Sequence, residues 1–307
     1  RHALLPYHRI QKWTGRRFVK TDLCSLGLVV QLHHLSLTCM NTVKCHVKLR
    51  ILHTNGIHHV ELRFCSCEKR IPQYIQLLHR GIYPASSKDG RIMTCTTFDF
   101  LNSLQMHSFT GKISTYNFYR ATELQMDSTG LRVPSSQYKP LLQMIRQWRY
   151  LHMIIRSGSG HDLQSITGDL VVEGHPQLQC PSCAFFACLV IFDGKLITAF
   201  RFLYSLRVCV DANFHLKEQL VSSHSRDPAL ADGLGYFVKR KPYDAWVDAK
   251  GDSNKINNCV PLAALTKQNT KFSKGLQYMG VGGICCGQSE MILKVANLKK
   301  GERCVGI

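Results

Sequence analysis

The stretch KLRILHTNGIHHVELRF, residues 48–64, predicts a β-hairpin. Apolar side chains alternate with polar ones on each side of its centre, at Val47, Leu49 and Ile51 and again at Val60, Leu62 and Phe64. Such alternation is typical of strands with one buried face. Asn55-Gly56, between the two runs, supplies the positive φ angles that a tight turn needs. The second strand then runs directly into Cys65-Ser66-Cys67.

Cys65 and Cys67 form a candidate zinc half-site. Because they lie two residues apart at a strand end, both thiolates emerge on one face and can share a metal ion. The amino end shows no secretory signal, and the longest apolar run, residues 183–192, is about half the length that spans a bilayer. In a reducing compartment, cysteine pairs mixed with histidines favour metal ligation over disulfides. The alternative is that both cysteines are ordinary core or polar residues.

The composition is that of a globular and basic protein. Of the 307 residues 45% are hydrophobic, which argues against wholesale disorder. Lys and Arg number 39 against 20 Asp and Glu, a net charge of +19 that is spread over the whole chain. This excess favours a polyanionic partner, with nucleic acid ahead of a membrane surface because no amphipathic lipid-binding helix is found. A solvated basic surface without a partner is the alternative.

Residues 71–160 are expected to be helical. FDFLNSLQMH (98–107) and STYNFYRATELQM (114–126) predict two helices, the second capped by Ser114 or Thr115. The strongest helical pattern is in residues 137–160, where one apolar face contains Leu141, Leu142, Ile145, Trp148, Leu151 and Ile155. Gly158 and Gly160 end this helix. Three cations lie off its apolar face and form either a solvated surface or a DNA-contacting one: Arg146, Arg149 and Arg156.

Three strand-like runs follow, at 201–212, 233–240 and 275–286. The first belongs to LYSLRVCVDANFHLK (203–217), in which an apolar, β-branched run stops at Asp211. Burying a carboxylate is costly unless it is paired or neutralised. Asp211 therefore either caps the next turn or faces water, or it holds a divalent cation at the end of a strand.

Dispersed strings along the chain carry a resemblance to a known family. They occur in a fixed order and include YHRIQKW, LHTNGIHHVELRFCSCEK, FDFLNSLQMHS, YNFYRATELQMDSTG, DANFHLK and KGLQYMGVGG. Together they resemble the amino-terminal half of a fungal transposase of the Kyakuja–Dileera–Zisupton (KDZ) group. The part before about residue 70 is similar to the CxC2 cysteine cluster that accompanies those transposases.

The resemblance implies an α+β chain in three parts. These are a truncated CxC2-like zinc-binding hairpin domain at 1–70, a helical region at 71–160, and an incomplete ribonuclease-H-like core at 161–307. Such a core opens with three consecutive antiparallel strands, and its first catalytic carboxylate projects from the first strand. The three strand-like runs fit this opening, and the matching residue is Asp211.

The implied activity is DNA cutting and strand joining in the nucleus, with Mg²⁺ or Mn²⁺ held by carboxylates. DNA is the implied partner, and no membrane or small-molecule substrate is expected. In the family the second acid lies in a Tyr-Asp motif downstream of the third strand, which we expect to fall after Ile307, and none of Asp232, Asp244, Asp248 and Glu290 ends an apolar strand. We expect residues 1–307 to lack the second and third catalytic acids and to be inactive by themselves. The alternatives are a zinc-stabilised DNA- or chromatin-binding module without catalysis, and a relic without activity.

The resemblance also implies structural zinc ligands. Besides Cys65 and Cys67 these are His2, His8, His34 and Cys39, with His33 as a rival for His34 and with Cys24 or Cys45 as substitutes. One complete site would use His34, Cys39, Cys65 and Cys67, whereas a site through His2 and His8 would be short of ligands. Cys180 and Cys183 have the spacing of a second half-site. Cys286 matches a further ligand of the family, but Ser289 stands where the family has histidine.

Overall fold

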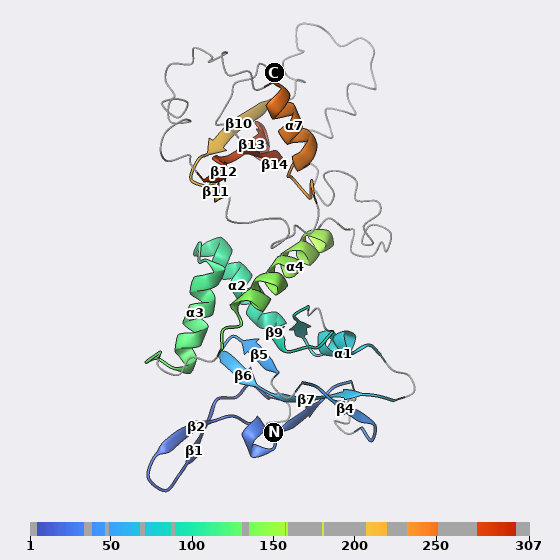
Figure 1. Cartoon of the computed structure of the whole chain (residues 1–307), viewed down its shortest axis with the longest axis vertical. Helices are drawn as coiled ribbons and strands as arrows, with labels where there is room; N and C mark the ends of the chain where they lie inside the picture. The colour runs from blue at the N-terminus through green and yellow to red at the C-terminus, as the bar shows by residue number, and fades with distance from the viewer. Residues whose placement is uncertain are drawn as a thin grey trace. The chain divides into compact units, whose positions relative to one another are not determined.

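The computed structural model describes residues 5–33, 39–46, 49–67, 71–86, 90–130, 135–156, 158, 180, 207–219, 232–250 and 275–298 (Figure 1). The chain forms two compact units, Arg1–His152 and Met153–Ile307, which are described separately. Both combine helices with small sheets, so the α+β class predicted from the sequence is confirmed in this coarse form.

The predicted hairpin forms the centre of the first unit. Strand β5 (Arg50–His53) pairs antiparallel with β6 (Gly56–His59), and the last pair of the ladder is His53 with Gly56. The turn therefore consists of Thr54 and Asn55, one residue earlier than predicted, and Gly56 has a φ of 146°. The side chain of Asn55 donates to the backbone oxygen of Tyr7 (2.8 Å), which ties the amino-terminal segment to the turn.

Two later strands extend the hairpin into a four-stranded sheet, in the order β6-β5-β9-β8. Strand β9 (Thr94–Thr97) runs parallel to β5, and β8 (Ile82–Pro84) runs antiparallel to β9. These strands show that the region 71–160 is not only helical and that its backbone pairs with residues before 70. The domain boundaries at 70 and 160 stay predictions.

The strand after the hairpin belongs to a different sheet. Strand β7 (Glu61–Cys65) lies between β3 (Val29–Gln31), to which it is parallel, and β4 (Thr42–Lys44), to which it is antiparallel. Between β6 and β7 there is a single residue, the buried Val60. The two sheets share one hydrophobic core, which contains Val30, Leu49, Ile51, Val60, Leu62, Phe64, Leu77, Ile82 and Cys95.

Four helices complete the first unit or begin in it. They are α1 (Gln73–His79), α2 (Phe98–Thr110), α3 (Thr115–Met126) and α4 (Tyr138–Arg156). The two helices predicted at 98–107 and 114–126 are confirmed, and of the two candidate caps it is Ser114 whose hydroxyl accepts from the amide of Asn117 (3.1 Å). Helix α4 is confirmed, and Gly158 after it has a φ of 75°.

The apolar face of α4 differs from the prediction in its last turns. Leu141, Ile145 and Trp148 are buried as expected, and so is Met144. Leu151 and Ile155, however, are exposed, while Ile154 is buried. At about 100° per residue, Ile154 lies on a different face of the helix from Leu141, Ile145 and Trp148, and it belongs to the second unit.

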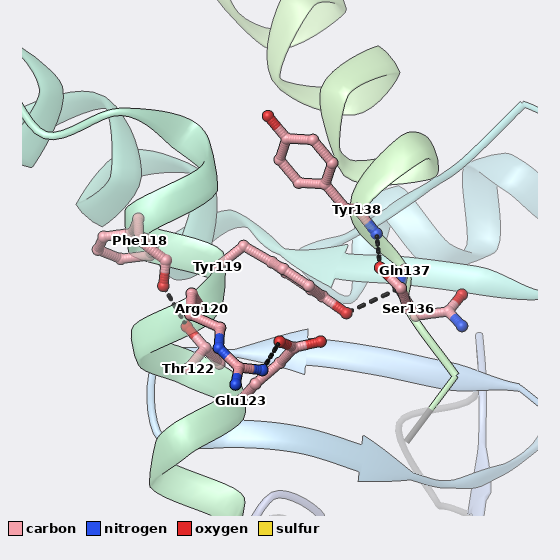
Figure 2. Close-up of polar contacts among 8 residues, drawn as sticks. All are labelled: Phe118, Tyr119, Arg120, Thr122, Glu123, Ser136, Gln137 and Tyr138. Atoms are coloured by element: carbon pink, nitrogen blue, oxygen red, sulfur yellow. Dashed lines mark hydrogen bonds and ion pairs between the residues drawn. The ribbon is translucent and has the colours of Figure 1, made fainter. Parts of the chain in front are cut away.

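A buried tyrosine joins α3 to the start of α4. The side chain of Tyr119 points from α3 toward the chain that enters α4, and its hydroxyl oxygen accepts from the backbone amide of Gln137 at 2.8 Å (Figure 2). On the same helix the Arg120 guanidinium donates to the largely buried Glu123 carboxylate at 2.9 Å. These contacts satisfy the polar groups that the packing of α3 takes out of water.

A two-stranded ribbon precedes the sheets. Strand β1 (Ile10–Trp13) pairs antiparallel with β2 (Phe18–Thr21), and a short 3-10 turn, η2 (Cys24–Leu26), follows. Figure 1 shows the ribbon, dark blue, extending away from the two sheets of its unit.

The second unit contains a three-stranded antiparallel sheet in the order β10-β13-β14. Its strands are β10 (Val208–Asn213), β13 (Gly280–Cys286) and β14 (Ile292–Leu298). The short strands β11 (Glu218–Gln219) and β12 (Leu276–Tyr278) pair beside them. Where they are described, the predicted runs 201–212 and 275–286 thus form strands. Residues 201–206 lie outside the described part of the chain.

The middle predicted run, 233–240, is wrong as a strand. Gly233 and Gly235 both have positive φ and interrupt the extended backbone, which leaves one isolated bridge between Phe237 and Val295. Helix α7 (Arg240–Lys250) then begins at the end of the run. The third strand of the sheet is instead β14, which the sequence analysis did not predict.

Candidate metal centre

Three thiols meet at the end of strand β7. The Sγ atom of Cys39 lies 3.7 Å from that of Cys65 and 3.5 Å from that of Cys67. All three sulfurs lie within 4.8 Å of one another. A tetrahedral zinc ion with Zn–S bonds of about 2.3 Å requires its sulfur ligands to be roughly 3.8 Å apart. The three thiols therefore fit one face of a zinc coordination shell.

The pairing of the strands explains why these cysteines meet. Thr42 of β4 stands opposite Cys65 of β7, so the residues just before β4 return to the end of β7. The amide of Ser66 donates to the backbone oxygen of Asn41 (2.9 Å) and fixes the loop between the two cysteines. The amide of Cys39 donates to the side-chain oxygen of Gln31 on β3 (2.8 Å). All three strands of this sheet thus position the thiols.

Gln76 on helix α1 holds the cysteine loop from the other side. Its side-chain oxygen accepts from the amide of Cys65 (2.9 Å). Its side-chain nitrogen donates to the backbone oxygens of Cys65 (3.1 Å) and Ile71 (2.8 Å). Gln76 is 1% exposed, so these hydrogen bonds replace all of its contact with water. Neither this residue nor the half-buried Gln31 was predicted, because a glutamine that orients a metal ligand has no characteristic spacing in a sequence.

Crowding of the thiols changes their acidity. Hydrogen bonds to the Cys65 and Cys39 side chains raise the pKa of Cys67 to about 12. A divalent cation offsets this effect, since metal-bound cysteines are thiolates and their protons are released on binding. The arrangement thus favours a metal ion over three free thiolates.

The other predicted ligands of this centre do not join the thiols. His2 and His34 lie outside the described residues. His8 and His33, and the substitutes Cys24 and Cys45, are described but do not belong to the group. Within the described ranges no fourth His, Cys, Asp or Glu joins it. The roles of His2, His8 and His34 as ligands stay predictions.

A second thiol group lies in the other unit. Cys180 and Cys286 are both buried, and the Sγ atom of Cys180 lies 3.0 Å from the hydroxyl oxygen of Ser289. The Ser289 hydroxyl and the backbone amides of Ser289 and Gln288 donate to the sulfur of Cys286 and lower its pKa to about 6. The turn after β13 thus stabilises a thiolate, as metal-binding turns do. Cys183 lies outside the described residues.

Asp211 lies inside a strand and not at its end, so that part of the prediction is wrong. It pairs with Gly283 of β13, and β10 continues to Asn213. The turn after β10 is capped by Asn213, whose side-chain oxygen accepts from the amide of His215 (2.9 Å). Asp211 itself is exposed, and one of its oxygens accepts from the amide of Ala212 (2.7 Å). Among the described residues, no donor is hydrogen-bonded to its second oxygen, which is therefore available to a cation.

Two other acids of this unit have structural contacts. A side-chain oxygen of Asp232 accepts from the amide of Arg240 at the start of α7 (2.9 Å). Asp244 accepts from the buried hydroxyl of Tyr278 (2.9 Å), which also accepts from Arg240 (2.6 Å). Glu290 lies in the turn between β13 and β14 with a φ of 57°.

The three arginines of α4 do not form a uniform stripe. Arg146 is half-buried, Arg149 is exposed and donates to the Ser108 hydroxyl (3.3 Å), and Arg156 is exposed in the last turn. Their role in DNA contact stays a prediction.

Comparison with known families agrees with this geometry. Residues 23–130, which include the three thiols, match the CxC2-like cysteine cluster associated with KDZ transposases. Residues 204–306, which include β10, β13 and β14, match the Kyakuja–Dileera–Zisupton transposases. No curated protein and no solved structure matches the chain. In the described part of the chain no helix is long and apolar enough to cross a bilayer.

These two matches define the chain as a transposase-derived protein. More specifically, it is related to the KDZ transposases and combines a CxC2-like cysteine cluster with a KDZ transposase segment, which confirms the resemblance.

Proposed function

We propose that this chain is a zinc-stabilised, DNA-binding part of a KDZ-type transposase, and that β10, β13 and β14 are the opening strands of its ribonuclease-H-like core. The observation that carries the proposal is the triangle of Cys39, Cys65 and Cys67, whose spacing fits zinc and which lies within the CxC2 match. The net charge of +19 supports DNA as the partner, since a basic surface attracts the phosphate backbone.

The order of β10, β13 and β14 supports the core assignment. Three antiparallel strands that follow one another in the sheet are what the resemblance implies for the beginning of such a core. Asp211 lies on the first of them, and a Cβ built at the opposite residue, Gly283, meets nothing within 4 Å. The carboxylate thus stands on an open part of the strand pair, accessible to a cation and to DNA.

Asp211 would act as the first of several metal ligands. In two-metal phosphoryl transfer, Mg²⁺ or Mn²⁺ held by acids activates the attacking oxygen and stabilises the leaving one. The Asp211 carboxylate supplies one charged oxygen ligand for this purpose, and further acids must converge on the same place. Among the described residues, no group of three metal-binding side chains includes Asp211.

The net charge of +19, which requires no catalytic acid, also supports a second candidate function, a DNA- or chromatin-binding module without catalysis. The two functions differ in their response to Asp211→Asn. In a protein that adds the family's further acids to residues 1–307, the variant should abolish Mn²⁺-dependent DNA cleavage while DNA affinity stays unchanged. Full cleavage by the variant contradicts a catalytic Asp211. No cleavage by the unsubstituted protein, with DNA binding intact, supports the module.

Metal content tests the zinc centres separately. Cys65→Ser and Cys67→Ser should each lose the zinc of the first unit, and Cys180→Ser and Cys183→Ser report on the proposed second site. Cys209→Ser is the matched control, because Cys209 is exposed on β10 and belongs to neither thiol group. Equal zinc in the control and in the Cys65 and Cys67 variants contradicts the site.

A further inference from the structure

The ribbon β1–β2 is exposed along almost its whole length. Every residue from Gln11 to Lys20 is exposed. The ribbon's ladder ends at the pair Trp13 and Phe18, and the turn beyond it is closed by Thr14, whose amide and hydroxyl both donate to the backbone oxygen of Arg17 (3.1 and 2.9 Å). The tip is therefore a defined turn and not a frayed end.

The charge of this segment has one sign. Residues 5–21 contain five Lys or Arg and no Asp or Glu. Two of the cations anchor the base, because Arg9 and Lys20 donate to the backbone oxygens of Gln125 and Met126 at the carboxyl end of α3. A helix carboxyl end carries partial negative charge, so it is a favourable place for both side chains.

The other three cations lie toward the tip. Lys12, Arg16 and Arg17 are exposed, and none of them has an ion-pair partner among the described residues. Arg16 and Arg17 lie in the turn that joins the two strands, and Lys12 lies on β1 one ladder pair before it. Like charges this near to one another in the chain repel in the absence of an anion. Such an arrangement favours a polyanion that contacts all three at once.

Two aromatic rings lie beside these charges. Trp13 is 55% exposed and Phe18 is 66% exposed, and their ring centroids are 4.9 Å apart. As a directly opposed pair they share one face of the ribbon. Large rings left in water next to cations are typical of surfaces that bind nucleic acid, where they contact bases or sugars while the cations contact phosphates.

We infer that the ribbon β1–β2 is a contact surface for duplex DNA. A two-stranded ribbon fits the width of the major groove, so its tip can enter while the cations contact the flanking phosphates. The inference rests on the proposed DNA-binding function and names the surface that performs it. The ribbon precedes the segments that match known families, 23–130 and 204–306.

Binding of the full chain to a fluorescently labelled DNA duplex tests this surface. The ribbon variant is Lys12→Gln, Arg16→Gln and Arg17→Gln. The matched control is Lys44→Gln, Lys112→Gln and Lys217→Gln, which removes the same charge from other exposed positions. The ribbon variant should bind about 10- to 100-fold more weakly at physiological salt. Its slope of log affinity against log salt concentration should be smaller by up to about 2.7, since each lost phosphate contact reduces the slope by about 0.9. The control should change affinity less than about threefold.

The aromatic pair has a separate readout. Trp13→Ala with Phe18→Ala should weaken binding while leaving the salt slope unchanged, because rings form no ion pairs with phosphate. Since the ribbon is exposed, circular dichroism of each variant should match that of the unsubstituted protein. If the ribbon variant and the control lose DNA affinity equally, the inference is overturned, whereas the proposed DNA-binding function of the chain still stands. If the unsubstituted chain binds no duplex, both the inference and the proposed function fail. Tighter binding of single strands than of duplex also overturns the assignment.

Discussion

Replacing Gln76 by methionine should weaken both the first unit and its metal centre. Methionine keeps the length of the buried side chain but removes the hydrogen bonds to the amide and carbonyl of Cys65 and to the carbonyl of Ile71. At about 1 kcal/mol for each bond, the free energy of unfolding should fall by about 3 kcal/mol. Because the same bonds orient the loop that carries Cys65 and Cys67, zinc affinity should fall by about tenfold or more.

Gln105 on α2 provides the matched control. It is also a buried glutamine, but its side-chain oxygen has no hydrogen-bond partner among the described residues. Gln105→Met should therefore leave the free energy of unfolding unchanged or raise it by up to about 1 kcal/mol. Urea denaturation and competition with a chromogenic zinc chelator measure the two quantities. Equal stability and equal zinc affinity in the Gln76 and Gln105 variants would refute the reasoning.

Three further predictions follow from the described contacts. Zinc affinity should rise with pH, because the pKa of Cys67 is raised to about 12 and the thiol must lose its proton to bind zinc. Calorimetry should detect the released proton, and a zinc affinity that does not depend on pH contradicts the prediction. Burial and the nearby His53 and Arg9 lower the pKa of His58 to about 4, so the free energy of unfolding should decrease as pH falls from about 6.5 to about 4. In His58→Gln the urea midpoint should depend less on pH over this range. Gly56→Ala should destabilise the first unit by about 1–2 kcal/mol, because φ is 146° and a Cβ would lie 2.3 Å from the sulfur of Met126; Gly283→Ala, which has open space, should be tolerated in urea denaturation.

Periodicity alone was sufficient for the elements whose burial follows a simple pattern. Helices α2, α3 and the first half of α4 have apolar residues at helical spacing, and β5 has a turn signal directly after it. Strand β9 was missed because its sequence is TCTT, which has no apolar alternation although all four residues are buried. Its hydroxyls are satisfied by side chains from distant elements, such as Gln137 for Thr94 (2.6 Å), which no local pattern reveals.

The metal centre was predicted only in part, because local spacing does not reveal side chains that come from distant elements. The spacing of Cys65 and Cys67 indicates a half-site, and the family resemblance added Cys39. The side chains that orient these cysteines come from β3 and α1, and their positions depend on the sheet order and not on spacing. The aromatic and basic ribbon was missed although the residues KWTGRRF, 12–18, interleave both kinds of side chain.

The connection from β6 to β7 through the single residue Val60 couples the unfolding of the two sheets. A strand that leaves one sheet and enters the next without a loop cannot detach from either alone, and the core on both sides of it is shared. Amide hydrogen exchange in the two sheets should then proceed through one cooperative opening. A metal ion that binds only the folded cysteine loop stabilises everything that opens with it. The hairpin around Asn55 would thus gain protection from a ligand that it never touches.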